Sequence, residues 1–203
     1  MASKIRPNLQ DPMKIIRRLY RAIIACWRNT IFSIRNLKGR VRKTGRLSLN
    51  VPLICDGSGQ VTLGSDISIG YGLASKIGDG MVRLQARGAN ARISVGSATQ
   101  FSNNVQVFAE QSVVIGSRCL IGDAVLILDS DFHDLSADGR HARPAETAPV
   151  VLEDNVFVGS RVIILKGVTI GKDSVIGAGS VVVRSIPPGV IAAGNPAKVI
   201  RNL

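Results

Sequence analysis

Both histidines of the chain, His133 and His141, lie in one polar stretch, residues 128–150, together with five acidic residues. An ordinary imidazole is mostly neutral near pH 7, so it can take a proton from an alcohol. Two of the acids, Asp131 and Asp134, flank His133 and are placed either to orient its ring or to lie in solvent. A long polar stretch inside a regular framework is usually functional or disordered, and the two histidines favour function.

The framework around this loop is a repeat of six residues. Apolar residues recur at every sixth position in three sets, at 63–69, at 95–127 with a slip of two after Val107, and at 152–182; glycine follows many of them. These positions are Leu63, Ile69, Val95, Phe101, Val107, Ile115, Ile121, Ile127, Leu152, Val158, Ile164, Ile170, Ile176 and Val182. A period of six fits neither an α-helix nor a heptad. It predicts an all-β domain, a triangular coil in which each hexapeptide supplies one short strand and one corner.

The composition agrees with many short strands. Of 203 residues, 45% are hydrophobic and 21 are glycine, whereas only 4% are aromatic. A chain rich in Val, Ile and Gly but poor in rings indicates strands and tight turns rather than a helical bundle. The scarcity of rings also argues against a nucleic-acid-binding protein that stacks bases on aromatic side chains.

The net charge of +12 arises in the N-terminal segment alone. Residues 1–46 hold thirteen Lys or Arg and one acid, whereas residues 47–203 hold thirteen basic and thirteen acidic residues. We therefore divide the chain into a basic segment, 1–46, and a neutral domain, 47–203. Within the segment, the pattern of 11–37 predicts an amphipathic α-helix, and 38–46 a basic linker.

The predicted helix has a wide apolar face and a basic polar face. This combination is typical of helices that lie on anionic membranes, but it also fits a helix that packs on its own domain or on a neighbouring subunit. No apolar run has the length of a membrane span. The three cysteines, Cys26, Cys55 and Cys119, are odd in number and lack CxxC spacing. We therefore expect them to be reduced and buried, and the protein to be cytoplasmic.

At the C-terminal end the repeat resembles a known family. The runs VFVGSRVIILKGVTIGKDSVIGAGSVV (156–182) and IPPGVIAAGNPAKVIR (186–201) are similar to those of the hexapeptide-repeat acyltransferases, and in particular to galactoside and maltose O-acetyltransferases. The resemblance covers about residues 60–203. It implies a left-handed parallel β-helix, a homotrimer with active sites between subunits, and acetyl-CoA as co-substrate, with no metal.

The resemblance also assigns roles to residues. It implies that His133 is the general base, although this chain has one extra residue just before it. For His141 we expect a surface role. Asn104, Glu110 and Asp131 are expected near the acceptor. The cofactor is expected to contact Phe157, Ser160, Ala178, Arg184, Lys198 and Arg201. Phe157 fits a packed core ring equally well, and we expect Lys166, a further cation on a coil corner, to be solvated.

The expected function is acetyl-CoA-dependent O-acetylation of a sugar hydroxyl, in polysaccharide or lipopolysaccharide biosynthesis. N-acetylation of an amino sugar, nucleotide sugar or antibiotic stays open, because the run Phe-Ser-Asn-Asn at 101–104 departs from the pattern of the galactoside enzymes. A non-catalytic trimeric scaffold is disfavoured by the histidine loop. A carbonic anhydrase of this fold needs three zinc ligands, normally all histidine, and the chain has two histidines.

Overall fold

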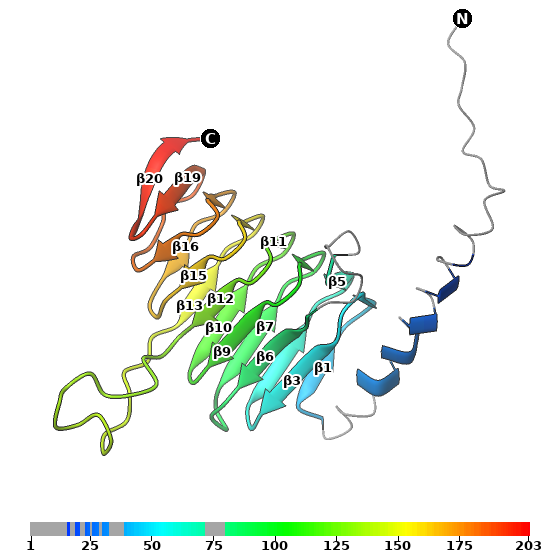
Figure 1. The fold of residues 1–203 in the computed structure, drawn as a ribbon, viewed down its shortest axis with the longest axis horizontal. Helices are drawn as coiled ribbons and strands as arrows, with labels where there is room; N and C mark the ends of the chain where they lie inside the picture. The colour runs from blue at the N-terminus through cyan, green and yellow to red at the C-terminus, as the bar shows by residue number, and fades with distance from the viewer. Residues whose placement is uncertain are drawn as a thin grey trace, which may run out of the picture.

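The computed structural model describes residues 39–71 and 80–203 and, in the N-terminal segment, residues 16, 19–20, 23–24, 26–28 and 30–32. Its strands are short and stack along one axis (Figure 1). They form three sheets, and the chain visits the first, second and third sheet in turn before it returns to the first one coil further along. The described part of the domain is therefore a three-sided prism.

The first and third sheets have six strands each. The first sheet consists of β1 (Val41–Lys43), β4 (Gln60–Leu63), β7 (Arg92–Val95), β10 (Ser112–Ile115), β13 (Val150–Leu152) and β16 (Thr169–Ile170). The third sheet consists of β3 (Leu53–Gly57), β6 (Val82–Ala86), β9 (Gln106–Ala109), β12 (Leu126–Leu128), β15 (Ile163–Ile164) and β18 (Val181–Val182). Every pairing within these two sheets is parallel.

The second sheet has eight strands and closes the C-terminal end of the prism. It consists of β2 (Leu47–Leu49), β5 (Ile67–Ile69), β8 (Gln100–Phe101), β11 (Leu120–Ile121), β14 (Phe157–Val158), β17 (Val175–Ile176), β19 (Val190–Gly194) and β20 (Ala197–Asn202). Only the last pair, β19 and β20, is antiparallel. This terminal hairpin lies at the opposite end of the prism from the helical N-terminal residues (Figure 1).

The hexapeptide positions form the interior, as predicted. All fourteen are buried, from Leu63 at 0% exposed to Val182 at 0%, and the least buried are Val95 and Ile121 at 3%. Register stacks equivalent positions on successive coils, for example Val61 on Ile93 and Ile127 on Ile164. Each fully buried Ile or Leu side chain contributes about 1.5–3 kcal/mol relative to an exposed one. The interior columns therefore account for the stability of a chain with few aromatic residues.

The small residues after these positions allow close approach of neighbouring corners. A Cβ atom at Gly96 would lie 2.5 Å from the carbonyl carbon of Gly116 and 2.5 Å from the nitrogen of Ser117. Two positions later the chain turns in the left-handed region, with φ of 58° at Ala98 and 57° at Arg118. The period of six is thus a consequence of one strand plus one tight corner per side.

The described residues between Ile16 and Phe32 are helical. Phe32 is 5% exposed and joins the core, and the Arg28 guanidinium donates to the carbonyl oxygen of Asn50. The helix thereby packs on the first coil. The expected helix ends, 11–15 and 33–37, lie outside the described residues. No helix among the described residues is long and apolar enough to cross a bilayer.

Two sequence-based expectations need correction. Strand β1 pairs with β4, so residues 41–43, assigned to a linker, already belong to the first coil. The cysteines are free, as expected, but only Cys119 is fully buried; Cys55 is partly buried and Cys26 is exposed on the helix.

Candidate active site

The histidine loop leaves the third sheet at the end of β12 and returns to the first sheet at β13. Its base is a short antiparallel ladder in which Ser130 bridges Thr147. The N–H of Asp131 donates to the carbonyl of Glu146 at 3.2 Å, and the N–H of Ala148 donates to the carbonyl of Asp129 at 2.9 Å. The two arms of the loop are therefore fixed to each other before the chain reaches the first histidine.

A buried carboxylate ties this base to the preceding coil. Asp129 is fully buried. Its Oδ1 atom accepts the N–H of Glu110 at 2.8 Å, and its Oδ2 atom accepts those of Gln111 and Ser112 at 2.8 and 2.7 Å. Charged hydrogen bonds of this kind are stronger than neutral ones. Asp129 was not singled out in the sequence analysis. Its position directly after the buried strand β12 could have indicated a buried carboxylate.

A lysine ties the base to the following coil. The Lys166 ammonium lies 2.8 Å from Asp131 Oδ2 and 2.7 Å from Glu146 Oε2, one carboxylate from each arm. These two carboxylates raise the pKa of Lys166 above its ordinary value, because they stabilise the charged form. The expectation that Lys166 is solvated is wrong: its side chain is 23% exposed and bridges the arms.

The residue before His133 packs back onto the prism. Phe132 has a φ of 60°, and its N–H donates to the hydroxyl oxygen of Ser130 at 3.0 Å. Its ring meets the ring of Phe108 edge to face, with centroids 6.3 Å apart and an 88° angle. The Arg87 guanidinium lies over both rings, 4.3 Å from the Phe132 centroid and 5.1 Å from that of Phe108.

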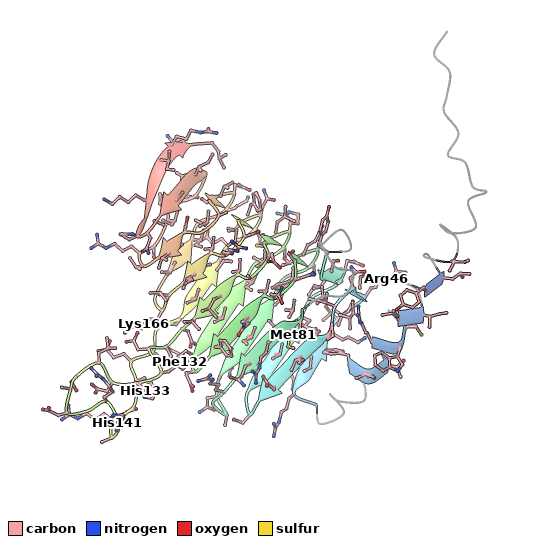
Figure 2. All side chains as sticks on the ribbon, viewed as in Figure 1. Arg46, Met81, Phe132, His133, His141 and Lys166 are labelled. Atoms are coloured by element: carbon pink, nitrogen blue, oxygen red, sulfur yellow. The ribbon has the colours of Figure 1, made fainter. Side chains whose placement is uncertain are left out.

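Both histidines are exposed. In the loop, Phe132 lies near the prism, His133 further out, and His141 toward the tip (Figure 2). Neither flanking acid orients His133 in this structure. Asp131 pairs with Lys166, and Asp134 accepts the N–H and the hydroxyl of Ser136, which lower the pKa of its carboxyl group.

Two predicted acceptor residues lie at the two ends of β9. Asn104 is exposed at the edge between the second and third sheets, with a φ of 59°, and its amide nitrogen lies 3.3 Å from Asp123 Oδ1. Glu110 is half-buried at the opposite edge, below the loop, 3.7 Å from Arg87. The third sheet carries a groove of about 510 Å³ whose lining includes Asn104, Phe108 and Phe132 but not Glu110.

The predicted cofactor residues are more widely spread. Ser160 and Ala178 occupy equivalent corners of successive coils, and the N–H of Gly179 donates to the carbonyl of Ser160 at 2.9 Å. Phe157, on β14, is 46% exposed over a hollow of about 480 Å³ on the second sheet, so the alternative of a packed core ring is wrong. The three cations are all exposed: Lys198 and Arg201 on β20, and Arg184 after β18.

Known proteins share part of this sequence. Residues 149–184 match a sequence model described as the hexapeptide repeat of succinyl-transferase. The galactoside O-acetyltransferase of Escherichia coli (strain K12) is 38% identical over 113 residues, 56% of this chain and 55% of that protein. The chain spans about half the length of the curated relatives it matches first.

Solved structures extend the likeness to the fold. A hexapeptide-repeat acetyltransferase from Vibrio cholerae, complexed with acetyl coenzyme A, matches with a TM-score of 0.58 at 26% identity, over 82% of this chain and 73% of that one. This chain therefore resembles the hexapeptide-repeat acetyltransferases in sequence and in fold. A maltose O-acetyltransferase from Clostridium difficile 630 matches with a TM-score of 0.56 at 26% identity, over 95% and 89%. The resemblance and the predicted left-handed parallel β-helix are confirmed.

In this hexapeptide-repeat chain the candidate catalytic and cofactor residues lie on different edges. His133 projects from the edge between the third and first sheets, whereas Ser160 and Ala178 lie at the edge between the second and third. The width of the third sheet separates them within one chain. No group of three His, Cys, Asp or Glu that could hold a metal occurs among the described residues.

Proposed function

We propose that this protein transfers the acetyl group of acetyl-CoA to a hydroxyl group of a sugar. The observation that carries the proposal is the loop between β12 and β13, which Asp129 and Lys166 fix to the prism and which presents an exposed His133. The named activities of the galactoside and maltose O-acetyltransferases, which share the repeat, support the same reaction.

In the proposed reaction His133 is the general base. Its neutral imidazole accepts the proton of the acceptor hydroxyl as that oxygen forms a bond to the thioester carbon. The same imidazole then returns the proton to the departing thiolate sulfur, so that no net proton is lost. We assign to the hydroxyl of Ser160 a hydrogen bond donated to the developing oxyanion in the site that it shares with a neighbouring subunit.

Asn104, which lines the groove, and Glu110, at the corner after β9, are the residues we assign to the acceptor. Asp131 was expected beside them, but its pairing with Lys166 leads us to assign it to the loop base. Phe157, Ser160 and Ala178 are assigned to the pantetheine arm. Arg184, Lys198 and Arg201 are assigned to the phosphates of CoA, which bind cations strongly because they carry several charges.

The separation of His133 from Ser160 and Ala178 favours a homotrimer in which each site combines His133 of one subunit with the pantetheine groove of the next, at Ser160 and Ala178. Sedimentation should give a trimer, and an active monomer would exclude this arrangement. A mixing experiment tests the sharing directly. Inactive His133→Ala subunits, refolded with an equal amount of a Ser160→Trp variant that blocks the groove, should recover roughly a quarter of the wild-type sites. If each site lies within one subunit, mixing recovers nothing.

We further propose that the N-terminal helix holds the trimer on the cytoplasmic face of an anionic membrane. Ile16, Leu19, Tyr20, Ile23 and Trp27 are 57–67% exposed, and basic residues alternate with them in the sequence. Such a face gains free energy from burial among lipid chains and from the anionic headgroups. A lipid-linked glycan in polysaccharide or lipopolysaccharide biosynthesis would then meet the enzyme at its own surface.

Thiol release from acetyl-CoA, measured across a panel of acceptors, tests the reaction. The panel contains free galactosides and maltosides, amino sugars, nucleotide sugars and lipid-linked glycans. Turnover with a hydroxyl acceptor supports O-acetylation, and a product that carries the acetyl group on nitrogen supports the N-acetyltransferase alternative. Absence of turnover with every acceptor, together with no binding of acetyl-CoA, would favour a non-catalytic scaffold.

A further inference from the structure

Two consecutive residues of the histidine loop are held by cations from two different coils. Asp131 pairs with Lys166, which belongs to the coil after the loop. Phe132 lies under Arg87, which belongs to the second coil before it. The next residue along the chain is His133. Both cations lie on the edge between the third and first sheets, so the loop base is held between them along the axis of the prism.

The contact with Lys166 is partly shielded from water. The Lys166 and Asp131 side chains are 23% and 21% exposed, whereas Glu146 is 84% exposed. The Oδ2 atom of Asp131 is itself buried, and the Lys166 ammonium is its charged neighbour at 2.8 Å. A half-buried carboxylate is costly to leave unpaired, so Asp131 is fixed next to Lys166 more firmly than an exposed pair would be.

Arg87 makes cation–π contacts with both aromatic rings. The guanidinium packs on Phe132 and Phe108, while its Nε atom donates to Gln85 Oε1 at 2.7 Å and its charge lies 3.7 Å from Glu110. Arginine is suited to this position because a planar guanidinium stacks on rings while its edge makes hydrogen bonds. The ring of Phe132, in a left-handed backbone conformation, is thereby held against β9.

We infer that Lys166 and Arg87 are positioning residues that together set the location of His133 relative to the acceptor groove. This inference rests on the proposed function. Arg87 also lines the groove, but in this inference each cation acts through the residue that it holds. A displacement of about 1 Å in a reacting group can cost about a hundredfold in rate. Fixing the two residues before His133 restricts such displacement, whereas the following residues 135–138 are exposed.

Substitutions on the two cations test the inference. Lys166→Met removes the charge but keeps the length of the side chain, and Arg87→Lys keeps the charge but loses the stacking plane. Each should lower kcat about tenfold to a hundredfold and leave the KM for acetyl-CoA within twofold. Lys166→Arg, which keeps both ion pairs, should restore most of the activity. Exposed residues of the same types provide the controls, Lys172→Met and Arg92→Lys, which should match the wild type.

A double-mutant cycle and proteolysis separate positioning from general stability. Adding Lys166→Met to Asp131→Asn should cause little further loss of kcat, because both changes break one contact. Trypsin should cleave the loop after Arg140 faster in Lys166→Met and in Arg87→Lys, with no change in Tm. Faster cleavage needs no transferase activity, so it tests the brace separately from the reaction.

The outcomes distinguish the two hypotheses. If Lys166→Met and Arg87→Lys keep the wild-type kcat and cleavage rate while His133→Ala is inactive, the positioning inference is wrong and the proposed function stands. If the variants speed cleavage but the wild-type protein turns over no acceptor, the brace is real and the proposed function is wrong. A fall in Tm that parallels the fall in kcat and is not reversed by Lys166→Arg would make both residues structural and overturn the inference.

Discussion

The backbone N–H of Glu110 donates a 2.8 Å hydrogen bond to the carboxylate of Asp129, which is wholly buried at the base of the histidine loop. Glu110 is assigned to the acceptor, and Asp129 begins the loop that carries His133. Glu110, on a coil corner, and the loop that carries His133 are therefore linked through the carboxylate of Asp129.

Replacing Asp129 with Ala should destabilise the protein strongly. Three N–H groups, those of Glu110, Gln111 and Ser112, would lose their acceptor, and each unpaired buried donor costs about 1–3 kcal/mol. We expect a loss of about 3 kcal/mol or more in the free energy of unfolding, measured with denaturant. Asp138→Ala, which removes an exposed acid of the same loop, is the control and should change stability little. Equal stability of the two variants would contradict the role of Asp129.

Replacing His133 with Ala should lower kcat by about two to four orders of magnitude, the range expected for loss of a general base. Binding of acetyl-CoA should be unchanged, because the imidazole acts on the acceptor side. His141→Ala removes an equally exposed histidine of the same loop and should have a mild effect. The assignment fails if His133→Ala turns over near the wild-type rate, or if the two variants lose activity equally. Thiol release at saturating acetyl-CoA measures both.

The sequence predicted the prism well because its pattern is local. Each coil repeats the same aliphatic position and the same tight corner. The six-residue spacing of Ile164 and Ile170 is therefore enough to predict that both are buried. The slip of two between Val107 and Ile115 was also visible; it adds the longer corner at Glu110. The beginning of the coil was misplaced because β1 lies in a basic stretch with few apolar residues, and its pairing with β4 was not visible in the composition.

The loop was located correctly, but its internal contacts were not predictable from the sequence. The partners of Lys166 lie 35 and 20 positions earlier in the chain, in a stretch without periodicity. Asp131 was therefore judged by its neighbour in sequence, His133, rather than by its neighbour in space. Arg87 was missed for the same reason: its contact with Phe132 depends on two coils being stacked and on the left-handed turn before the histidine.

Charge reversal at the proposed phosphate end should weaken cofactor binding. Lys198→Glu and Arg201→Glu on β20, and Arg184→Glu after β18, should raise the KM for acetyl-CoA more than they lower kcat. Phosphate contacts are the same in the ground state and the transition state, so they act on binding. Arg42→Glu, on β1 at the other end of the prism, is the control. If KM is unaltered in all three variants, the phosphates bind elsewhere.

The cysteines should differ in reactivity with pH. Burial, with a smaller effect from the neighbouring Asp56 carboxylate, raises the pKa of the Cys55 thiol from 9.0 to about 12. At pH 8, iodoacetamide should therefore label exposed Cys26 and leave Cys55 and Cys119 unmodified, as counted by mass spectrometry. Denatured protein, the control, should take up three labels. Rapid labelling of Cys55 in the native protein would contradict its shielding.

The same shift predicts how stability depends on alkaline pH. The folded state binds the Cys55 proton more tightly than the unfolded state does, so folding is favoured while the thiol stays protonated. This contribution is complete below about pH 9, the ordinary pKa of the thiol, and is lost as the pH rises toward about 12. Cys55→Ser would remove this contribution, and a comparison of its unfolding midpoints with the wild type at pH 8 and pH 10.5 measures the effect.

The exposed face of the N-terminal helix should bind anionic lipid. Each basic residue near such a surface contributes about 1 kcal/mol, and this contribution falls as salt screens the charges. Full-length protein should co-sediment with vesicles of phosphatidylglycerol at low salt, less at high salt, and little with phosphatidylcholine. A chain that begins at Gly39 keeps β1 and should not co-sediment. The full-length double variant Leu19→Glu and Ile23→Glu changes only the exposed apolar face and should also stay in solution.

Three helices on one trimer would act together, so a weak affinity of each helix for lipid would become firm attachment of the assembly. The amount bound should then depend steeply on the number of intact helices, and trimers with one variant subunit should bind more tightly than trimers with two. Failure of the full-length protein to bind phosphatidylglycerol vesicles at low salt would exclude the membrane role. Dissociation of the trimer by the Leu19→Glu and Ile23→Glu change would instead make this face a contact between subunits, because glutamate there disrupts packing whether or not lipid is present.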